Sequence, residues 1–210
     1  MNNSVGNAGR LLWAGLRALL ALTVVCGVLY PLAVTGVAQA VFPRQANGSE
    51  ITDASGKVVG SELIGQTYKD LKWFQPRPSN GLGENSVNTQ YKLILSGATN
   101  RSGDNADLVK WVTDAKAAVV KDNSTADHKV KPSDVPADAV TSSGSGLDPH
   151  ISPEYAKLQV NRVAEKNGLD VKQVEKLVAD HTDDRILGFI GEPRVNVLQL
   201  NIALKELTNG

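Results

Sequence analysis

The stretch ALLALTVVCGVLYPLAVTGVAQAVFP, from Ala18 to Pro43, decides how the chain is organised, because its 26 residues include no charged side chain. An α-helix rises about 1.5 Å per residue, so this run could reach roughly 39 Å. The hydrocarbon core of a bilayer is about 30 Å thick, and a helix of a soluble protein is rarely apolar on every face. The sequence therefore predicts a transmembrane helix over residues 18–43.

Pro31 interrupts the helical pattern in the middle of this run. Proline has no backbone N–H, so the carbonyl of the residue four positions earlier, here Gly27, loses its helical donor. We therefore expect a kink between Gly27 and Pro31, which a membrane helix tolerates where a local adjustment satisfies the freed carbonyl.

Ala38-Gln39-Ala40 has the small-x-small pattern of a signal-peptidase site, so a cleaved signal sequence is an alternative. A cleaved signal usually has an apolar core of about 7–15 residues near the N-terminus. Because the apolar run here is longer, the sequence favours an uncleaved anchor.

Positive charge at the N-terminal end predicts the orientation of this anchor. Residues 1–17 carry Arg10 and Arg17 and no acidic residue, and the positive-inside rule keeps such an end in the cytoplasm. The sequence thus predicts a cytoplasmic tail at 1–17, disordered over its polar first ten residues. A single span follows at 18–43, and residues 44–210 form a periplasmic domain outside the inner (plasma) membrane.

Small residues repeat four positions apart at two places, Ala14 with Ala18 and Gly36 with Ala40. This spacing lets two membrane helices approach closely, so these positions are candidate contacts with a partner helix. Glycine and alanine are also common in membrane spans in general, and the sequence leaves both interpretations open.

The composition excludes several classes of function. The chain has 22 basic and 22 acidic residues, and only Arg10 and Arg17 precede residue 44, which leaves the domain a net charge of −2. This balance does not suit a nucleic-acid-binding protein, which needs a basic patch. The one cysteine, Cys26, lies in the apolar run, so the domain has no disulfide and no cysteine-based zinc site.

The sequence predicts an α+β domain whose C-terminal third is mostly helical. An apolar stripe from Leu108 to Val119 predicts a helix capped by Asp104 or Asn105. Residues 73–90 contain two prolines and two glycines and predict a long loop. Short strands are expected at 50–52, 57–59, 63–64 and 139–141, and strand or extended chain at 186–190 and 194–195.

Three more helices are predicted near the C-terminus from their end signals. Ser152, Asp170 and Asn196 are good N-caps, and Gly168 is a good stop signal. The expected inner faces consist of Ala156, Val160, Val163, Val174, Leu177, Val178, His181, Leu200, Leu204 and Leu207.

No catalytic or metal-binding residue is predicted. The sequence has no phosphate-binding glycine loop, zinc motif or nucleophile elbow. Ser145, Asp148 and His150 lie close in sequence, but a catalytic triad depends on geometry and not on adjacency. Two classes of protein remain, a non-catalytic subunit of a membrane complex and a free-standing, membrane-anchored binding module.

Several segments together resemble one family, the KdpC subunits of bacterial Kdp potassium-transporting ATPases. The resembling segments are YPL (30–32), FPRQANGS (42–49), GSELIGQ (60–66), FQPRPS (74–79), SGLD (145–148), ISP (151–153), QVNRVA (159–164) and IGEPRVNVLQLN (190–201). Each segment alone is weak evidence, but their joint order along the chain is highly specific. Residues 1–10 and about 100–138 match poorly.

The resemblance implies a non-catalytic accessory subunit of a high-affinity, ATP-driven potassium uptake complex, needed for assembly and activity. The implied partners are a potassium-channel-like subunit and a P-type ATPase subunit. One implied mechanism raises the ATP affinity of the ATPase subunit, and there the matching glutamine is Gln159, whose alternative interpretation is an exposed helix residue. The chain would then meet ATP only as part of the complex and bind no cofactor alone. The predicted topology, however, puts the domain outside the cytoplasm, where ATP is not supplied. A second mechanism is therefore an outer cap on the potassium pathway, with Arg77 of the loop 73–90 as a candidate contact outside the membrane.

Overall fold

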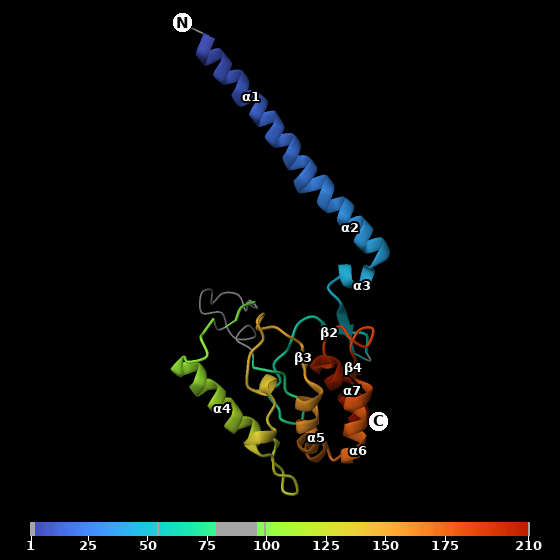
Figure 1. The fold of residues 1–210 in the computed structure, drawn as a ribbon. Helices are drawn as coiled ribbons and strands as arrows, with labels where there is room; N and C mark the ends of the chain where they lie inside the picture. The colour runs from blue at the N-terminus through green and yellow to red at the C-terminus, as the bar shows by residue number, and fades with distance from the viewer. Residues whose placement is uncertain (1–2, 54, 79–95, 99, 210) are drawn as a thin grey trace. The chain divides into compact units, whose positions relative to one another are not determined.

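The computed structural model describes residues 3–53, 55–78, 96–98 and 100–209. The chain divides into two compact units, Met1–Glu50 and Ile51–Gly210. Figure 1 shows a long N-terminal helical segment and a mixed unit of helices and short strands. Residues 79–90 of the predicted loop lie outside the described residues.

The first unit is almost entirely helical. Helix α1 (Asn3–Val24), the π-helical segment η1 (Val25–Leu29) and helix α2 (Tyr30–Val41) follow one another without a break, and the short helix α3 (Pro43–Ala46) comes next. Residues Ser4–Val41 make one helix that is long and apolar enough to cross a membrane. Because α1 already begins at Asn3, the prediction of a disordered segment over the first ten residues is wrong.

The segment η1 lies where the sequence predicts an irregularity. At its end the N–H of Tyr30 donates to the carbonyl of Val25, five residues earlier. This wider turn is typical of a π-bulge, and π-bulges and prolines are both places where helices kink. The structure thus has a local adjustment one turn before Pro31, and the kink itself stays a prediction.

The second unit contains two small antiparallel sheets. Strands β1 (Glu50–Thr52), whose first residue closes the first unit, and β2 (Val58–Ser61) form the predicted hairpin. Strands β3 (His150–Ile151), β5 (Arg194–Asn196) and β4 (Thr182–Asp183) form a sheet in the order β3-β5-β4. Its register pairs His150 with Asn196 and Thr182 with Val195. The strands predicted at 63–64 and 139–141 are wrong, since the chain forms a turn and a 3₁₀ helix there.

Four helices carry the rest of the unit: α4 (Ala106–Asn123), α5 (Pro153–Asn167), α6 (Val171–Asp180) and α7 (Val197–Asn209). Their ends confirm the predicted caps. The Ser152 hydroxyl accepts from the Tyr155 N–H at 3.0 Å, and the Asn196 side-chain oxygen accepts from Leu198 and Gln199. Gly168 ends α5 with a φ of 65°, a left-handed conformation that glycine adopts without strain.

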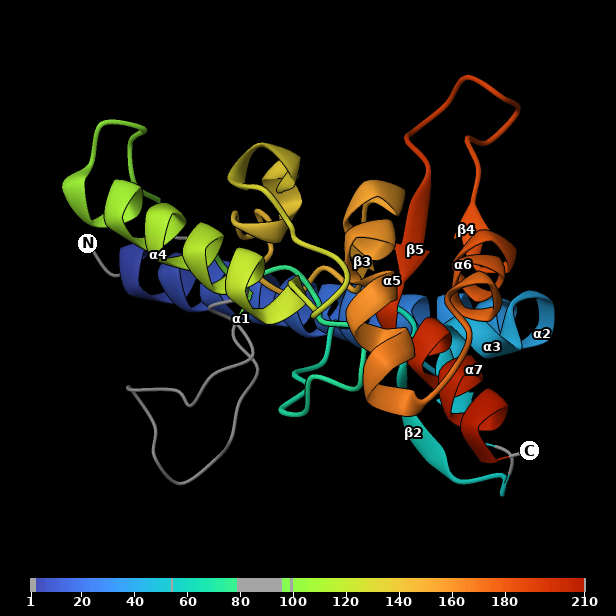
Figure 2. The ribbon, with the colours of Figure 1, turned by 90° about the horizontal axis from the view of Figure 1, so that it is seen from below.

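The core of this unit lies between α5, α6, α7 and β5. Figure 2 shows the chain between β4 and β5 projecting from the body that these helices form. The buried apolar residues include Phe74, Val160, Val163, Val174, Val178, Val195, Leu200 and Leu204. Leu207, expected on the inner face of α7, is exposed instead. The α+β class with a helical C-terminal third is confirmed.

Candidate functional site

Residues 71–75 form an irregular segment whose backbone is held by side chains of α5 and α7. The amide of Asn201 bonds both sides of Phe74, since its oxygen accepts from the Phe74 N–H at 2.8 Å and its nitrogen donates to the Phe74 carbonyl at 2.9 Å. The amide of Asn167 donates to the Lys72 carbonyl at 2.8 Å. A buried backbone needs such partners when no neighbouring strand supplies them.

Gln159 and Arg162 of α5 complete this arrangement, and both are buried. The Gln159 oxygen accepts from the Gln75 N–H at 2.7 Å and from the Arg162 guanidinium at 2.6 Å, while its nitrogen donates to the Gln75 carbonyl at 3.1 Å. Arg162 also donates to the carbonyls of Leu71 and Trp73 and to the Asn123 side chain. We name Gln159, Arg162, Asn167 and Asn201 the polar clamp.

Burial is the main electrostatic influence on the clamp. It lowers the pKa of Arg162 to about 10, because a guanidinium away from water loses hydration. Arg162 is therefore still charged at neutral pH, and four acceptors share that charge through hydrogen bonds. Charged donors form stronger hydrogen bonds than neutral ones, so this side chain is the strongest single tie in the clamp.

The sequence left open that Gln159 is an exposed helix residue, and the structure contradicts this. Gln159 is fully buried, so its interpretation as an exposed helix residue is wrong. Both polar atoms of its amide bond Gln75 or Arg162. The nucleotide-binding role stays a prediction, and in this conformation a nucleotide would have to displace the Gln75 backbone to reach the amide.

Arg77 lies in a second polar group, together with Asp148 and His150. Its guanidinium lies 3.0 Å from the Asp148 carboxylate and also donates to the Thr141 carbonyl. Burial alone would raise the pKa of Asp148, but bonds from His150 and Arg77 outweigh it and lower that pKa to about 2. The Ser145 hydroxyl bonds Ser143 and Leu147 and not His150. This arrangement positions a loop, and a partner contact of Arg77 stays a prediction.

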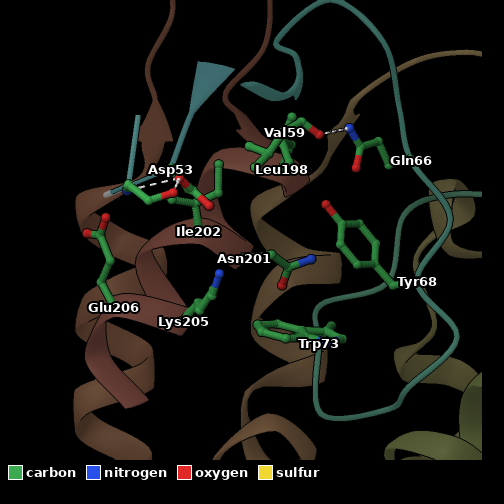
Figure 3. Close-up of a pocket in the computed structure, with 11 residues that line it drawn as sticks. Asp53, Val59, Gln66, Tyr68, Trp73, Leu198, Asn201, Ile202, Lys205 and Glu206 are labelled. Atoms are coloured by element: carbon green, nitrogen blue, oxygen red, sulfur yellow. Dashed lines mark hydrogen bonds between the residues drawn. The ribbon is translucent and has the colours of Figure 1, made fainter. Parts of the chain in front are cut away.

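An open cavity of about 500 Å³ lies between the β1–β2 hairpin, residues 66–73 and α7. Its walls are Asp53, Ser55, Val59, Gln66, Tyr68, Trp73, Leu198, Asn201, Ile202, Lys205 and Glu206. In Figure 3 the Tyr68 hydroxyl points into this space. That oxygen is buried and has no hydrogen-bond partner of good geometry among the described residues. Burial raises the pKa of Tyr68, and the nearby Asn201 amide, whose two polar atoms bond Phe74, lowers it by less. Sequence reasoning missed the cavity, because its walls come from segments more than 100 residues apart.

The candidate membrane contacts are all exposed within the chain itself. Ala14, Ala18, Gly36 and Ala40 each lie on an open face of their helix. A Cβ atom added at Gly36 would meet no atom within 4 Å. Within the first unit this face is therefore open to a lipid or to another helix.

The described part of the chain contains no group of three or more His, Cys, Asp or Glu residues that could hold a metal ion. The fold and its polar groups together define a class of protein, a small α+β unit preceded by one helix that is long enough to span a membrane.

Comparison with known proteins narrows this class. The family model of the K+-transporting ATPase c chain, KdpC, matches residues 12–206. A potassium-transporting ATPase KdpC subunit from Streptomyces avermitilis is 78% identical and covers 99% of this chain and 98% of its own length. The corresponding subunit of Streptomyces coelicolor is 67% identical over 99% of this chain and 97% of its own length. The KdpC subunit of Geobacter metallireducens is 46% identical over 90% of this chain and 93% of its own length. The chain belongs to the KdpC family.

Proposed function

We propose that this chain is a non-catalytic accessory subunit of an ATP-driven potassium uptake complex, needed for its assembly and activity. The observation that carries this proposal is the helix Ser4–Val41, which is long and apolar enough to cross a membrane. Such a surface needs lipid or a neighbouring helix. Because the relatives are named as subunits of a potassium-transporting ATPase, a helix of that complex is the natural neighbour.

The proposed partners are a potassium-channel-like subunit and a P-type ATPase subunit. The positive-inside rule favours a cytoplasmic N-terminal end because of Arg10 and Arg17, and with that orientation the second unit would lie outside the inner membrane. On that side ATP is not supplied. The geometry of Gln159 supports the same view, since its amide already bonds the Gln75 backbone. We therefore favour an outer cap on the potassium pathway over direct contact with ATP.

Gly36→Leu tests the assembly role. The substituted side chain meets nothing in the chain itself, so insertion and the fold of the second unit should be unchanged. Co-purification with the other subunits in mild detergent, and potassium-stimulated ATPase activity, should both fall about tenfold if a partner helix packs on Gly36. Val34→Phe is the matched control, because it also adds four carbon atoms, on the opposite side of the same helix. Equal assembly of Gly36→Leu, Val34→Phe and the unmodified chain would place the contact outside the membrane.

A free-standing, membrane-anchored binding module is the second candidate function. The cavity beside Tyr68 favours it, since its volume of about 500 Å³ is that of a ligand pocket. The same co-purification decides between the two functions. If the unmodified chain brings down neither the potassium-carrying nor the ATPase subunit, the binding module is the better conclusion.

A further inference from the structure

The hairpin between β4 and β5 ends in an exposed apolar loop. The exposed fractions of its large side chains are 59% for Ile186, 79% for Leu187, 72% for Phe189 and 49% for Ile190. We name residues 186–190 the apolar tip. In Figure 2 the loop that carries it projects away from α5, α6 and α7, so these helices do not cover it. Clustered exposed apolar side chains mark interaction sites far more often than single ones do.

The apolar tip is already ordered without a partner. Ile186 and Ile190 exchange two backbone hydrogen bonds, at 2.9 and 3.0 Å, and form an isolated antiparallel bridge. Leu187 and Gly188 turn the chain with φ values of 54° and 80°. Leu187 is one of the few non-glycine residues that adopt this conformation here, and backbone strain of this kind concentrates at functional sites. A loop that is ordered in advance loses little conformational entropy when it binds.

Two exposed ion pairs lie at the base of the hairpin. Arg185 pairs with Glu192, and Arg194 lies 3.6 Å from Asp183. Both cations next to the tip are thus matched by acids, and the exposed Asp184 adds a further negative charge. A loop that docks on an anionic lipid surface carries an excess of Lys or Arg with Trp or Tyr beside it. This hairpin has the opposite charge balance, which favours a protein surface with a basic rim.

The chain length limits where such a surface can lie. Ten residue steps separate Val41, the end of α2, from Ile51, the start of the second unit. Even a fully extended link of this length reaches only about 35 Å. If α2 ends at the membrane, the tip's partner is a protein that stands at the same membrane surface.

We propose that the apolar tip is a docking element that inserts into an apolar groove with a basic rim on another subunit of the same membrane complex. This inference rests on the proposed accessory function and names the surface outside the membrane that serves it. Phe189 and Leu187 are the anchors, because they are the two most exposed large side chains of the tip. A few buried apolar or aromatic anchors usually supply most of the binding energy of an interface.

The first experiment replaces both anchors in the full-length chain, by Leu187→Ser with Phe189→Ser. The variant is titrated in mild detergent against a complex of the remaining co-expressed subunits, and its dissociation constant should rise at least about tenfold. Val109→Ser with Trp111→Ser is the matched control, since these two apolar residues of α4 are also exposed. The control should bind within about threefold of the unmodified chain.

The outcomes separate this inference from the proposed function. If the unmodified chain does not bind the other subunits, the proposed function fails, and the inference fails with it. If the unmodified chain and the tip variant bind equally, only the docking role of the tip is overturned.

The second experiment identifies what the tip touches. A photoreactive phenylalanine analogue at position 189, in the assembled complex, should cross-link to another subunit and identify the groove by mass spectrometry. The same analogue at position 111 should give no such product. Cross-links only to lipid, or only to a second copy of this chain, would overturn the proposal in favour of a bilayer contact or self-association.

Discussion

The polar clamp and the apolar tip both depart from the usual distribution of side chains, since the clamp buries polar groups and the tip exposes apolar ones. The clamp buries Arg162, which is only 1% exposed, and the amides of Gln159 and Asn201, while the amide of Asn167 is partly buried. The tip exposes two isoleucines, a leucine and a phenylalanine. Both belong to the same unit and both are ordered, so neither is explained by loose structure.

The difference shows two separate reasons for departing from the hydrophobic pattern. In the clamp, polar side chains are buried because segment 71–75 has no neighbouring strand, and its carbonyl and N–H groups need partners. At the tip, apolar side chains are exposed although the backbone is satisfied by its own bridge. The clamp therefore serves the fold of this chain, whereas the tip contributes little to it. Stability measurements can break or sharpen this contrast.

The largest loss of stability is expected for Arg162→Met, which keeps the aliphatic stem and removes every donor. Four acceptors lose this donor, the carbonyls of Leu71 and Trp73 and the side chains of Asn123 and Gln159. The Gln159 oxygen and the Trp73 carbonyl still accept from Gln75, so the Leu71 carbonyl and the Asn123 oxygen are the two groups that lose their described donor. Each unsatisfied buried group costs about 1–3 kcal/mol, so a loss of about 3–5 kcal/mol is expected after partial relaxation. Urea unfolding of the full chain in detergent, followed by tryptophan fluorescence, measures it.

Lys157→Met is the control on the same helix, because Lys157 is exposed. It should change the free energy of unfolding by less than about 0.5 kcal/mol. A loss below about 1 kcal/mol for Arg162→Met would mean that water replaces the lost donors, and the clamp would then not be what holds segment 71–75.

The sequence predicted the parts of this fold that depend on neighbouring residues. The caps at Ser152, Asp170 and Asn196 act within one helical turn, so short-range patterns reveal them. The clamp joins residues far apart, such as Phe74 and Asn201, which lie 127 positions from each other. No local pattern in a single sequence contains that pairing.

For some residues the sequence pattern also failed to predict whether the side chain is buried or exposed. Leu207 follows the helical stripe of Leu200 and Leu204, but it lies on the last turns of α7, where the core no longer covers it. Gln159 appears on α5 like any polar surface residue, and only the nearby backbone of Gln75 explains its burial. The strand or extended chain expected at 186–190 is wrong, because residues 187–189 form a turn that only the bridge between Ile186 and Ile190 closes. The same expectation at 194–195 is confirmed by β5.

The next largest loss of stability is expected for a buried leucine, Leu204 of α7, and it is compared with an exposed one, Leu187 of the tip. Leu204 is fully buried in the core, so Leu204→Ala should reduce the free energy of unfolding by about 2–5 kcal/mol. Leu187 is 79% exposed, and Leu187→Ala should change it by less than about 0.5 kcal/mol. Both are measured by urea unfolding of the full chain. A loss above about 1.5 kcal/mol for Leu187→Ala would show that the tip supports the fold and would remove its contrast with the clamp.

The smallest effect is expected for Asp148→Asn, at a carboxylate that is neither as buried as the clamp nor as exposed as the tip. Asp148 accepts from Arg77 and His150, which hold its pKa at about 2, below the 3.8 of an unperturbed aspartate. A depressed pKa in the folded state stabilises the fold above about pH 4, and this contribution disappears as the pH falls through about 2. Since the group is half-exposed, solvent screening leaves about 1 kcal/mol of it at neutral pH.

The measurement is the difference in unfolding free energy between the unmodified chain and Asp148→Asn at several pH values. That difference should be about 1 kcal/mol at pH 7 and should shrink between pH 4 and 2, because the unmodified carboxylate then becomes protonated. Asp180→Asn, which removes an exposed partner of Lys176, is the control and should give less than about 0.5 kcal/mol throughout. A difference for Asp148→Asn that stays constant down to pH 2 would mean that the shape of the amide, and not the charge of the carboxylate, decides how tightly Arg77 holds this loop.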